Sequence, residues 1–375
     1  MSAADTAFRQ PRRAAIDLQT TAGALLLAAG ALLVASGQSE TSLVVAALFA
    51  SGGLLLLRRP GGITAAGLVL PYLALPGIIG TVRTTAGAVP IPVWLALAAC
   101  WFAAIAGVSY LSAIRGLSRT NGRVRDLAVA ALFGLWLMIL WETLIVGFKV
   151  PFILLPPPSA VWLKLTHSIP TLAADFRQTF LKAVIAGYAI GCTSGFLVAI
   201  VADRVGFLKR GLLPVGNLVS ALPIIGVAPI MVMWFGFDWQ SKAAVVVIMT
   251  FFPMLVNTLA GLSAAEAMER DLMRTYAANY WQSLLKLRLP AALPFIFNAL
   301  KINSTLAMIG AIVAEFFGTP VVGMGFRIST EVGRMNIDMV WAEIAVAALA
   351  GSVFYGVVAL IERAATFWHP SFRQS

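Results

Sequence analysis

The hydrophobic positions of this chain fall into long continuous runs that are separated by short polar connections. A run of roughly 20 apolar residues is long enough to cross a hydrocarbon core of about 30 Å. Continuous runs indicate helices, because the strands of a membrane barrel would alternate apolar and polar positions. We therefore predict an all-α integral membrane protein with about ten transmembrane helices, at residues 21–36, 42–57, 63–82, 91–114, 126–147, 176–201, 211–235, 241–263, 294–317 and 342–362.

The composition supports a membrane protein and excludes several other classes. Hydrophobic residues make up 60% of the chain and charged residues 11%, against about 45–50% and about 25% in soluble domains. Cys100 and Cys192 lie inside apolar runs, and His167 and His369 add no ligand cluster, so neither a disulfide framework nor a metal site is expected. The chain has no Gly-Lys dipeptide and hence no P-loop. We expect no cofactor and no catalytic residues.

The net charge of +11 reflects arginines and lysines that cluster in short connections between the runs. This pattern is typical of cytoplasmic loops and does not require a nucleic-acid partner. Placing both termini in the cytoplasm puts these basic residues inside: Arg9, Arg12, Arg13, Arg58, Arg59, Arg115, Arg119, Arg123, Arg125, Arg204, Lys209 and Arg210. A cleaved signal peptide at the first run, ending near "VASGQS", is the alternative. It would leave an odd number of spans and reverse the basic bias.

A basic linker, "RGLSRTNGRVR" at 115–125, divides the chain. Residues 1–114 form the first four runs, which are rich in Ala, Gly and Leu and contain few polar residues. The runs in 126–375 contain Trp, Asn, Pro, Lys and Glu. We expect 1–114 to be an accessory four-helix membrane extension, 115–125 a cytoplasmic linker, and 126–375 the functional core.

Several polar residues lie within or at the ends of the core runs: Glu142, Lys182, Asn257, Asn298, Lys301, Asn303 and Glu315. A charge at the bilayer centre costs about 2.5–3.5 kcal/mol on insertion scales, so such side chains face protein or water. They either line a polar pathway or serve as caps, snorkelling groups and bonds between helices. The run at 294–317 is the most polar. The candidates for a translocation pathway are Asn257, Asn298, Asn303, Met308 and Glu315.

Prolines interrupt two adjacent core runs: Pro214, Pro223 and Pro229 lie in the run at 211–235, and Pro253 lies in the run at 241–263. A proline inside a helix removes a backbone hydrogen bond and bends the helix. Broken helices beside a cavity at membrane depth are a feature of transporters. The prolines therefore favour a transporter.

The stretch "DLMRTYAANYWQSLLKLRLPAALP", Asp271 to Pro294, is too long to be a simple turn between two spans. Its apolar positions recur at three- and four-residue spacing, which predicts one amphipathic helix over about 266–290 that ends at Pro290. Pro294 would then open the next span. The helix could lie on the membrane surface. Its mixed charge, with acidic residues before the basic ones, suits a protein partner better than anionic lipid.

This stretch resembles the cytoplasmic loop of membrane subunits of binding-protein-dependent ABC importers. The loop pattern is Glu-Ala-Ala, three residues, Gly, nine residues, Ile, one residue, Leu-Pro. Anchored on Leu289-Pro290, it places Asp271 at Glu, Ala277 at Gly and Leu287 at Ile, while Leu272-Met273 replace Ala-Ala. Segments such as "PFILLPPPSAVW" and "LRLPAALPFIFNALKI" are similar to the nitrate/sulfonate/taurine branch, which includes permeases for riboflavin and thiamine-pyrimidine precursors. The resemblance covers about 126–375.

The resemblance implies a six-helix type I ABC importer permease core, preceded here by four accessory helices. It implies a bacterial inner membrane location and three kinds of protein partner: ABC ATPase subunits, a periplasmic substrate-binding protein and a second permease subunit, as in a homodimer. The chain would not be an enzyme itself, and its cargo would be a small organic solute or anion. The residues implied in ATPase coupling are Asp271, Arg274, Tyr276, Ala277, Ala278, Trp281, Leu289 and Pro290.

Two other function classes remain as alternatives. An ion-coupled secondary transporter would carry acidic residues on facing helices, for which Glu142 and Glu315 are the candidates. A scaffold or a membrane enzyme is disfavoured because the required residue clusters are missing. The substrate is not determined by this sequence, since in such importers selectivity lies largely in a separate binding protein.

Overall fold

The computed structural model of the chain describes residues 21–33, 45–47, 49–50, 52–53, 73, 75–83, 89–113, 119–220, 223–318 and 322–367. Within these ranges every regular element is a helix, as the continuous apolar runs predict. The chain divides into two compact units, residues 1–160 and 161–375. Each unit is described by itself.

The first unit is built around small apolar side chains. It contains a short apolar helix at Thr21–Leu33, a helical segment at 75–83, and the long helices α4 (Ile91–Ala113) and α5 (Arg119–Gly147). Its core consists mainly of alanine, valine and leucine, and Trp101 packs edge-on against Trp136 with ring centroids 5.7 Å apart. The helices α4 and α5 match the predicted spans at 91–114 and 126–147.

The start of α5 at Arg119 makes the second half of the basic linker helical, while residues 114–118 lie outside the described residues. The predicted spans at 42–57 and 63–82 also lie mostly outside them. Among the described helices, six are long and apolar enough to cross a membrane. Two of these belong to the first unit, and four belong to the second, at Ile169–Arg204, Trp239–Leu262, Tyr280–Glu315 and Ile337–Ala365.

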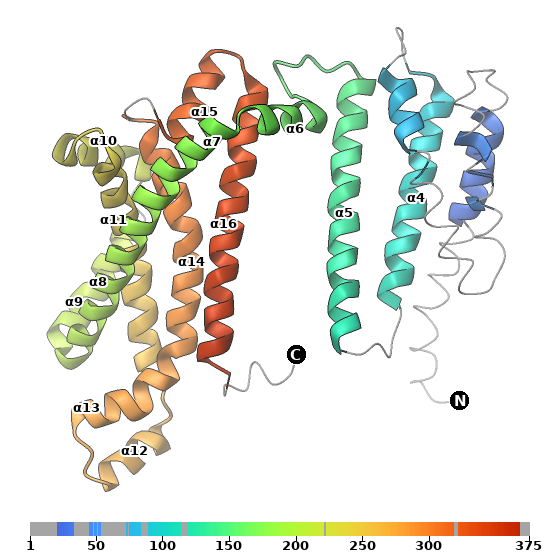
Figure 1. Ribbon diagram of the computed structural model, residues 1–375. Coiled ribbons are helices and arrows are strands. Elements are labelled where there is room, and N and C mark those ends of the chain that lie inside the picture. Colours follow the sequence, from blue (N-terminus) through green and yellow to red (C-terminus); the bar gives the residue numbers. More distant parts are fainter. Residues whose placement is uncertain are drawn as a thin grey trace, which may run out of the picture. The chain divides into compact units, whose positions relative to one another are not determined.

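The second unit is an assembly of long helices with short ones at both ends (Figure 1). Its first span is one helical run made of α7 (Ile169–Phe176), the π-helical η1 (Arg177–Val184) and α8 (Ile185–Arg204). The elements that follow are α9 (Gly206–Ser220), α10 (Ile224–Phe235), α11 (Trp239–Leu262), α12 (Ala267–Thr275), α13 (Tyr280–Ser283), η2 (Leu284–Arg288), α14 (Leu289–Glu315), α15 (Met324–Gly333) and α16 (Ile337–Ala365), and α6 (Pro158–His167) precedes α7.

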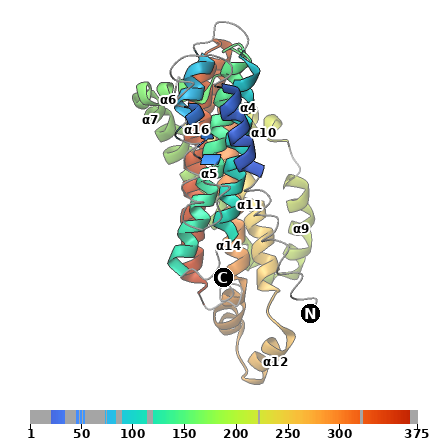
Figure 2. The same cartoon turned by 90° about the vertical axis from the view of Figure 1, so that its right-hand side faces the viewer.

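Figure 1 shows α12 and α13 at one end of the second unit and α15 at the other, and Figure 2 shows α12 at the same lower end. We call these the α12 end and the α15 end. The helices α11, α14 and α16 run between the two ends (Figure 1).

Glycines bring α8 and α11 into close contact. Gly187, Gly191 and Gly195 recur every fourth residue and therefore lie on one face of α8. A Cβ atom at Gly191 would lie 2.0 Å from Thr250 Oγ1, and one at Gly195 would lie 2.4 Å from the Phe251 carbonyl oxygen. Small residues at this spacing let helix backbones approach closely in membranes, where dispersion contacts replace the hydrophobic effect.

The predicted span at 211–235 is two helices rather than one. The helix α9 ends at Ser220, and α10 begins at Ile224 after Pro223, whose backbone is extended. A proline disfavours the helical conformation of the residue before it and cannot donate its own backbone hydrogen bond, which explains the break. Pro214, Pro229 and Pro253, in contrast, lie inside α9, α10 and α11. The second unit thus contains one interrupted helix, as the prolines suggest.

Candidate functional site

The connection between α11 and α14 is the candidate functional site that the sequence singles out. We call residues 266–288, which include α12, α13 and η2, the α12–α13 loop. A single helix over 266–290 is wrong, because the loop contains two helices with separate caps. Glu266 and Glu269 form a capping box at the start of α12, and Asn279 and Gln282 form another at the start of α13. Each box satisfies backbone N–H groups at a new helix start, so the chain begins a second helix at Asn279.

The chain turns between these helices at Ala277, which has a φ of 50°. This left-handed conformation is favourable for glycine and costs an L-residue energy. The backbone N–H of Ala277 donates to the carbonyl of Arg274 (2.9 Å), and that of Ala278 donates to the carbonyl of Met273 (3.0 Å). Ala277 stands where the loop pattern has its glycine, so the structure supplies a backbone reason for a glycine at this position.

Pro290 does not end the second helix, which corrects the prediction. The helical run continues from Tyr280 to Glu315, and Pro290 lies in the first turn of α14. The five residues of η2 directly before it form a π turn. A π turn bonds each N–H one residue further back than an α turn, and this change of register lets the helix pass Pro290 without a break.

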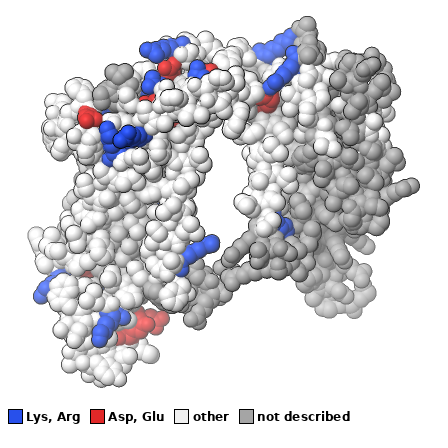
Figure 3. Space-filling view, viewed as in Figure 1, with Lys and Arg blue, Asp and Glu red and all other residues white. Residues whose placement is uncertain are grey.

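The α12 part of the loop is almost entirely exposed. None of its residues is buried, and the side chains of Met268 and Tyr276 are 81% and 77% exposed. Leu272, Trp281 and Leu285 add further exposed apolar surface. The ion pair between Asp271 and Arg274 (3.2 Å) is exposed on both sides, and Figure 3 shows charged side chains at this end of the unit. A mixed apolar and charged surface of this kind is typical of a protein-binding site.

The base of the loop, in contrast, is tightly held. Arg288 donates from Nη1 and Nη2 to the two carboxylate oxygens of Asp203 at 2.8 and 2.7 Å, and from Nε to the Leu262 carbonyl at 3.0 Å. Tyr280 donates to Asp203 Oδ2 at 3.1 Å. The guanidinium of Arg204 lies 5.5 Å from the centre of the Tyr280 ring. We call Asp203, Arg288 and Tyr280 the loop clamp.

Asn303, one of the predicted pathway residues, is a bond between helices in this structure. It is fully buried in α14, and its Nδ2 donates to the Thr250 carbonyl of α11 (2.8 Å) and to Cys192 Sγ of α8 (3.3 Å). Asn303 therefore joins three helices at one level.

The other four pathway candidates lie in different surroundings. Met308 and Glu315 are buried in α14. Asn257 is half-buried and donates to the carbonyl of Pro253 within α11 (2.8 Å), where the proline lies inside the helix. Asn298 is exposed. The structure does not bring the five together into one site.

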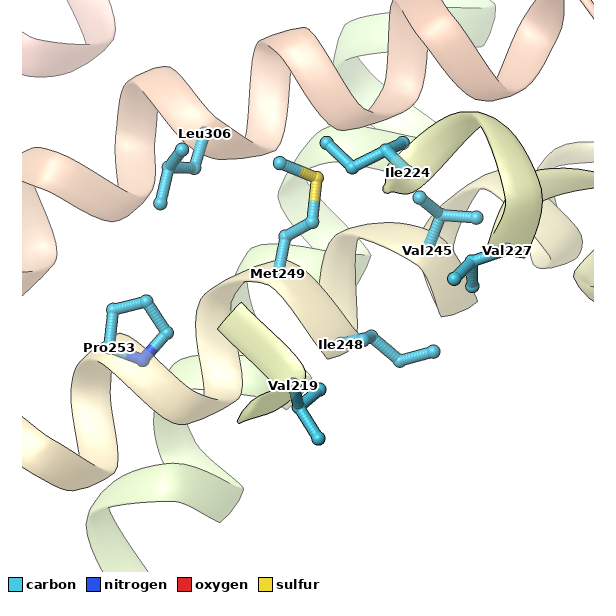
Figure 4. A pocket seen from close by; sticks show the side chains of 8 residues that line it. All are labelled: Val219, Ile224, Val227, Val245, Ile248, Met249, Pro253 and Leu306. Atoms are coloured by element: carbon cyan, nitrogen blue, oxygen red, sulfur yellow. The ribbon is translucent and has the colours of Figure 1, made fainter. Parts of the chain in front are cut away.

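An apolar cavity of about 200 Å³ lies between α9, α10, α11 and α14 (Figure 4). No lining side chain is charged, and the wall consists of Val219, Ile224, Val227, Val245, Ile248, Met249, Pro253 and Leu306. It is next to the break between α9 and α10 and to the proline of α11. Bent and broken helices thus border the cavity.

At the α15 end, buried side chains hold the first residues of α15. Glu315 accepts a hydrogen bond from Thr179 Oγ1 (2.8 Å) and one from the Gly325 N–H (2.7 Å), and Thr179 Oγ1 accepts one from the Met324 N–H (2.8 Å). Glu315 is 2% exposed and Thr179 is fully buried. The side chain of Glu315 therefore lies at the N-terminus of α15 and accepts a hydrogen bond from one of the N–H groups that have no partner within that helix.

Asp175 holds the same helix start from α7. It is fully buried, accepts from the Gly323 N–H (2.6 Å), and forms an ion pair with Arg327 (2.8 Å). The hydrogen bond to Asp175 raises the pKa of Arg327, so this guanidinium stays charged. Glu343 of α16 is fully buried beside Asp175.

A lysine holds the end of α14 from the other side. Lys242 Nζ is buried and donates to the carbonyls of Phe237 (2.6 Å) and Gly318. Beside it, Asp238 caps α11, and the hydrogen bond from the Trp239 N–H lowers the pKa of Asp238. The part of the chain that the structure describes holds no cluster of three His, Cys, Asp or Glu residues suited to a metal ion.

Glu142, in the first unit, also has fixed partners. Its carboxylate forms an ion pair with Arg83 and accepts from the Ser159 N–H (3.0 Å) and Oγ (2.9 Å). Arg83 also donates to Ser159 Oγ (3.0 Å). These contacts join the 75–83 segment to α5 and to the start of α6.

Sequence reasoning missed Asp203 and Asp175, because both lie at helix ends where an acidic residue is unremarkable. One available signal concerns Asp175. Ser168 followed by Ile169-Pro170 is a typical helix start, and it would have extended the predicted span at 176–201 back over Asp175. The glycine spacing in α8 was likewise visible in the sequence.

Comparisons with known proteins find similarity to membrane components of transport systems. Residues 191–367 match the family described as "Binding-protein-dependent transport system inner membrane component". A probable ABC transporter permease protein of Haemophilus influenzae is 31% identical over 59% of this chain and 89% of its own length. The formylaminopyrimidine transport permease protein of Halalkalibacterium halodurans is 30% identical over 63% and 94%, and the riboflavin transport system permease protein of Chloroflexus aurantiacus is 27% identical over 69% and 95%.

Proposed function

This chain belongs to the family of binding-protein-dependent transport system inner membrane components and is a multi-pass transport permease, and on that premise we propose that it works in an ATP-driven importer. Its cargo would be a small organic solute or anion that a periplasmic binding protein delivers. The names of its relatives include riboflavin, formylaminopyrimidine, aliphatic sulfonate and taurine permeases, so a heteroaromatic solute and a small sulfonate are both candidates. The chain would lie in a bacterial inner membrane with both termini in the cytoplasm, and a second copy would complete the pathway.

The observation that carries this proposal is the exposed α12 surface on a firmly held base. An ATPase subunit would bind Tyr276, Leu272 and Trp281, with Asp271, Arg274 and Ala278 around them. Closure of the ATPase pair around ATP would move the α12–α13 loop. Leu289 and Pro290, at the start of α14, would pass that movement to the membrane helices.

Replacing Tyr276 with glutamate tests this contact. The change puts a charge into the proposed interface, so an ABC ATPase subunit co-expressed with the chain should no longer co-purify with it. Because Tyr276 is 77% exposed, insertion and yield should not change. Met335→Glu is the matched control, since Met335 is also exposed but lies at the α15 end. An ATPase that stays bound to Tyr276→Glu would contradict the docking surface.

The pathway proposal is confined to the surfaces that α14 and α11 expose. A cysteine at the exposed Asn298 should react with a water-soluble maleimide at a rate that depends on bound nucleotide. A cysteine at the buried Asn303 should stay protected in the state described here. If Asn298→Cys is protected in every nucleotide state, α14 does not line the pathway.

The four N-terminal helices would be an accessory extension of a core that inserts without them once the buried charge of Glu142 is also removed. Deleting 1–114 removes Arg83 and leaves the buried Glu142 without its cation. We therefore expect the deletion to insert poorly, and the same deletion with Glu142→Gln to insert and assemble, as measured by membrane yield and gel filtration. Failure of both would mean that the extension is an integral part of the core.

No contact among the residues that the structure describes favours the ion-coupled secondary transporter. Both of its candidate acids, Glu142 and Glu315, have fixed hydrogen-bond partners in the protein. Uptake that follows a proton or sodium gradient in the absence of ATP would support this alternative against the importer.

A further inference from the structure

The clamp at the base of the α12–α13 loop joins the ends of three membrane helices. Asp203 lies in the last turn of α8, Leu262 ends α11, and Arg288 directly precedes α14. Arg288 bonds to both of the other residues through its three guanidinium nitrogens. The contact is therefore a junction of helix ends that are far apart in sequence.

The junction is shielded from water. The side chain of Asp203 is 4% exposed and that of Arg288 is 17% exposed. A second Asp–Arg pair lies wholly within the loop: Asp271 and Arg274 are 68% and 84% exposed and make one contact at 3.2 Å. An exposed pair contributes little and is screened by salt, whereas a buried bidentate pair fixes the geometry of both partners. The two pairs thus form an internal comparison, with the buried pair at the base of the loop and the exposed pair within it.

The clamp also sets the position of the surface proposed to bind the ATPase. Tyr280 donates to Asp203 and packs edge-on against Trp281, with ring centroids 5.4 Å apart. Arg204, the neighbour of Asp203, lies over both rings, at 5.5 and 5.9 Å from their centres. The indole of Trp281 is half exposed on the loop surface. A displacement of Asp203 would therefore displace the aromatic part of that surface.

We infer that Asp203, Arg288 and Tyr280 are positioning residues that make the α12–α13 loop and the adjoining ends of α8, α11 and α14 move as one rigid body. The functional consequence of this inference rests on the proposed function. A rigid junction would transmit a movement of the ATPase to three membrane helices at once. Lysine would not replace Arg288, because it has a single point charge instead of a planar fork with three bonded nitrogens.

Spin labels test this rigidity. One label is placed on α12 at Met268→Cys and one in the last turn of α8 at Val201→Cys, both exposed positions, in full-length protein that lacks Cys100 and Cys192. With the clamp intact, the label-to-label distances should form one narrow distribution, unchanged when an ATPase and a non-hydrolysable ATP analogue are added. Asp203→Asn should lose the narrow distribution, and Arg288→Lys should lose it as well. Asp271→Asn is the matched control and should keep it.

A second variant and thermal unfolding distinguish a positioning role of the loop clamp from a role in folding alone. Asp203→Asn can fail to fold because it leaves a buried arginine without its anion. The double variant Asp203→Asn/Arg288→Gln leaves no unpaired charge, and it should fold yet still give a broad distribution. A narrow distribution in the folded double variant, or a broad one in the protein with an intact clamp, would overturn the inference. The label-to-label distances and thermal unfolding are also measured without an ATPase. A failure of the wild-type chain to bind an ATPase would therefore contradict the proposed function without changing the result for the clamp.

Discussion

At the α15 end of the second unit, buried polar groups bond to one another and to a helix start, whereas the polar side chains of α12, at the tip of the α12 end, are exposed. Asp175, Thr179 and Glu315 are all buried and bind consecutive backbone N–H groups of one helix start. The residues of α12 include none that is buried, and its Asp–Arg pair is open to solvent. Both ends are connections between membrane helices, so their different chemistry is not a consequence of topology.

The difference concerns where each end finds its partners. At the α15 end, Asp175, Thr179 and Glu315 have their hydrogen-bond partners within the chain, so a change at one of these residues should act on folding. The α12 end is fixed only at its base and exposes large apolar side chains such as Met268 and Tyr276. A change at its tip should act on binding and leave folding nearly untouched. The following predictions are arranged by the size of the expected effect on stability.

The largest effect is expected for Asp175→Ala. The change removes the carboxylate that bonds to Arg327 and to the Gly323 N–H, and breaking a buried pair in this way costs about 3–5 kcal/mol. Thermal unfolding in detergent and the yield of monodisperse protein would measure the loss. Asp338→Ala is the control, since Asp338 forms a longer and more exposed contact with Lys164 (3.4 Å) at the same end. Equal losses in the two variants would contradict the buried network.

A second effect is expected midway between the ends, where α8 packs against α11. Leucine at Gly191 would place its Cβ atom 2.0 Å from Thr250 Oγ1, so the helices must separate. Overpacking of this kind costs about 1–3 kcal/mol. Gly356→Leu makes the same change in α16 where no atom lies within 4 Å, and it should be nearly neutral in the same unfolding assay. If Gly191→Leu left the free energy of unfolding unchanged, the close contact between α8 and α11 would not contribute to stability.

The membrane helices of this fold are predictable from sequence, because run length alone separates them. The spans at 91–114, 241–263, 294–317 and 342–362 correspond to α4, α11, α14 and α16. The loop is less predictable, because one side chain, Asn279, starts a new helix inside a continuous apolar stripe. Periodicity carries no sign of that local hydrogen bond.

The loop clamp could not be predicted from the sequence, for a different reason. Asp203 and Arg288 are separated by 85 positions in the chain, and each looks like an ordinary charge at a span end. Only the packing of α8 beside α11 and α14 brings them together. The candidate coupling residues, in contrast, came from a local pattern, and the exposure of Asp271, Arg274 and three others supports treating these five as a surface; the others are Tyr276, Ala277 and Trp281.

A small effect is expected for Asp271→Ala at the α12 end. The exposed pair with Arg274 contributes at most about 1 kcal/mol, and high salt should reduce even that. Thermal unfolding at low and high salt would measure it, and ATPase co-purification on the same sample would measure binding. A loss comparable to that of Asp175→Ala would remove the distinction between the two ends.

The smallest effect, and the only stabilising one, is expected for Ala277→Gly. Ala277 has a φ of 50°, and the left-handed region costs an L-residue about 1–2 kcal/mol. Glycine loses about 0.5–1 kcal/mol more conformational entropy on folding than alanine, so the net gain should be only about 0.5 kcal/mol. Ala278→Gly has no positive φ to relieve and should be neutral or destabilising. If Ala277→Gly raises the free energy of unfolding and leaves ATPase binding unchanged, the turn matters for the shape of the loop and the chain tolerates the strain of alanine there. Weaker ATPase binding despite the gain in stability would mean that the methyl group of Ala277 is part of the docking surface. The strained backbone at Ala277 would then be the cost of a contact with the ATPase.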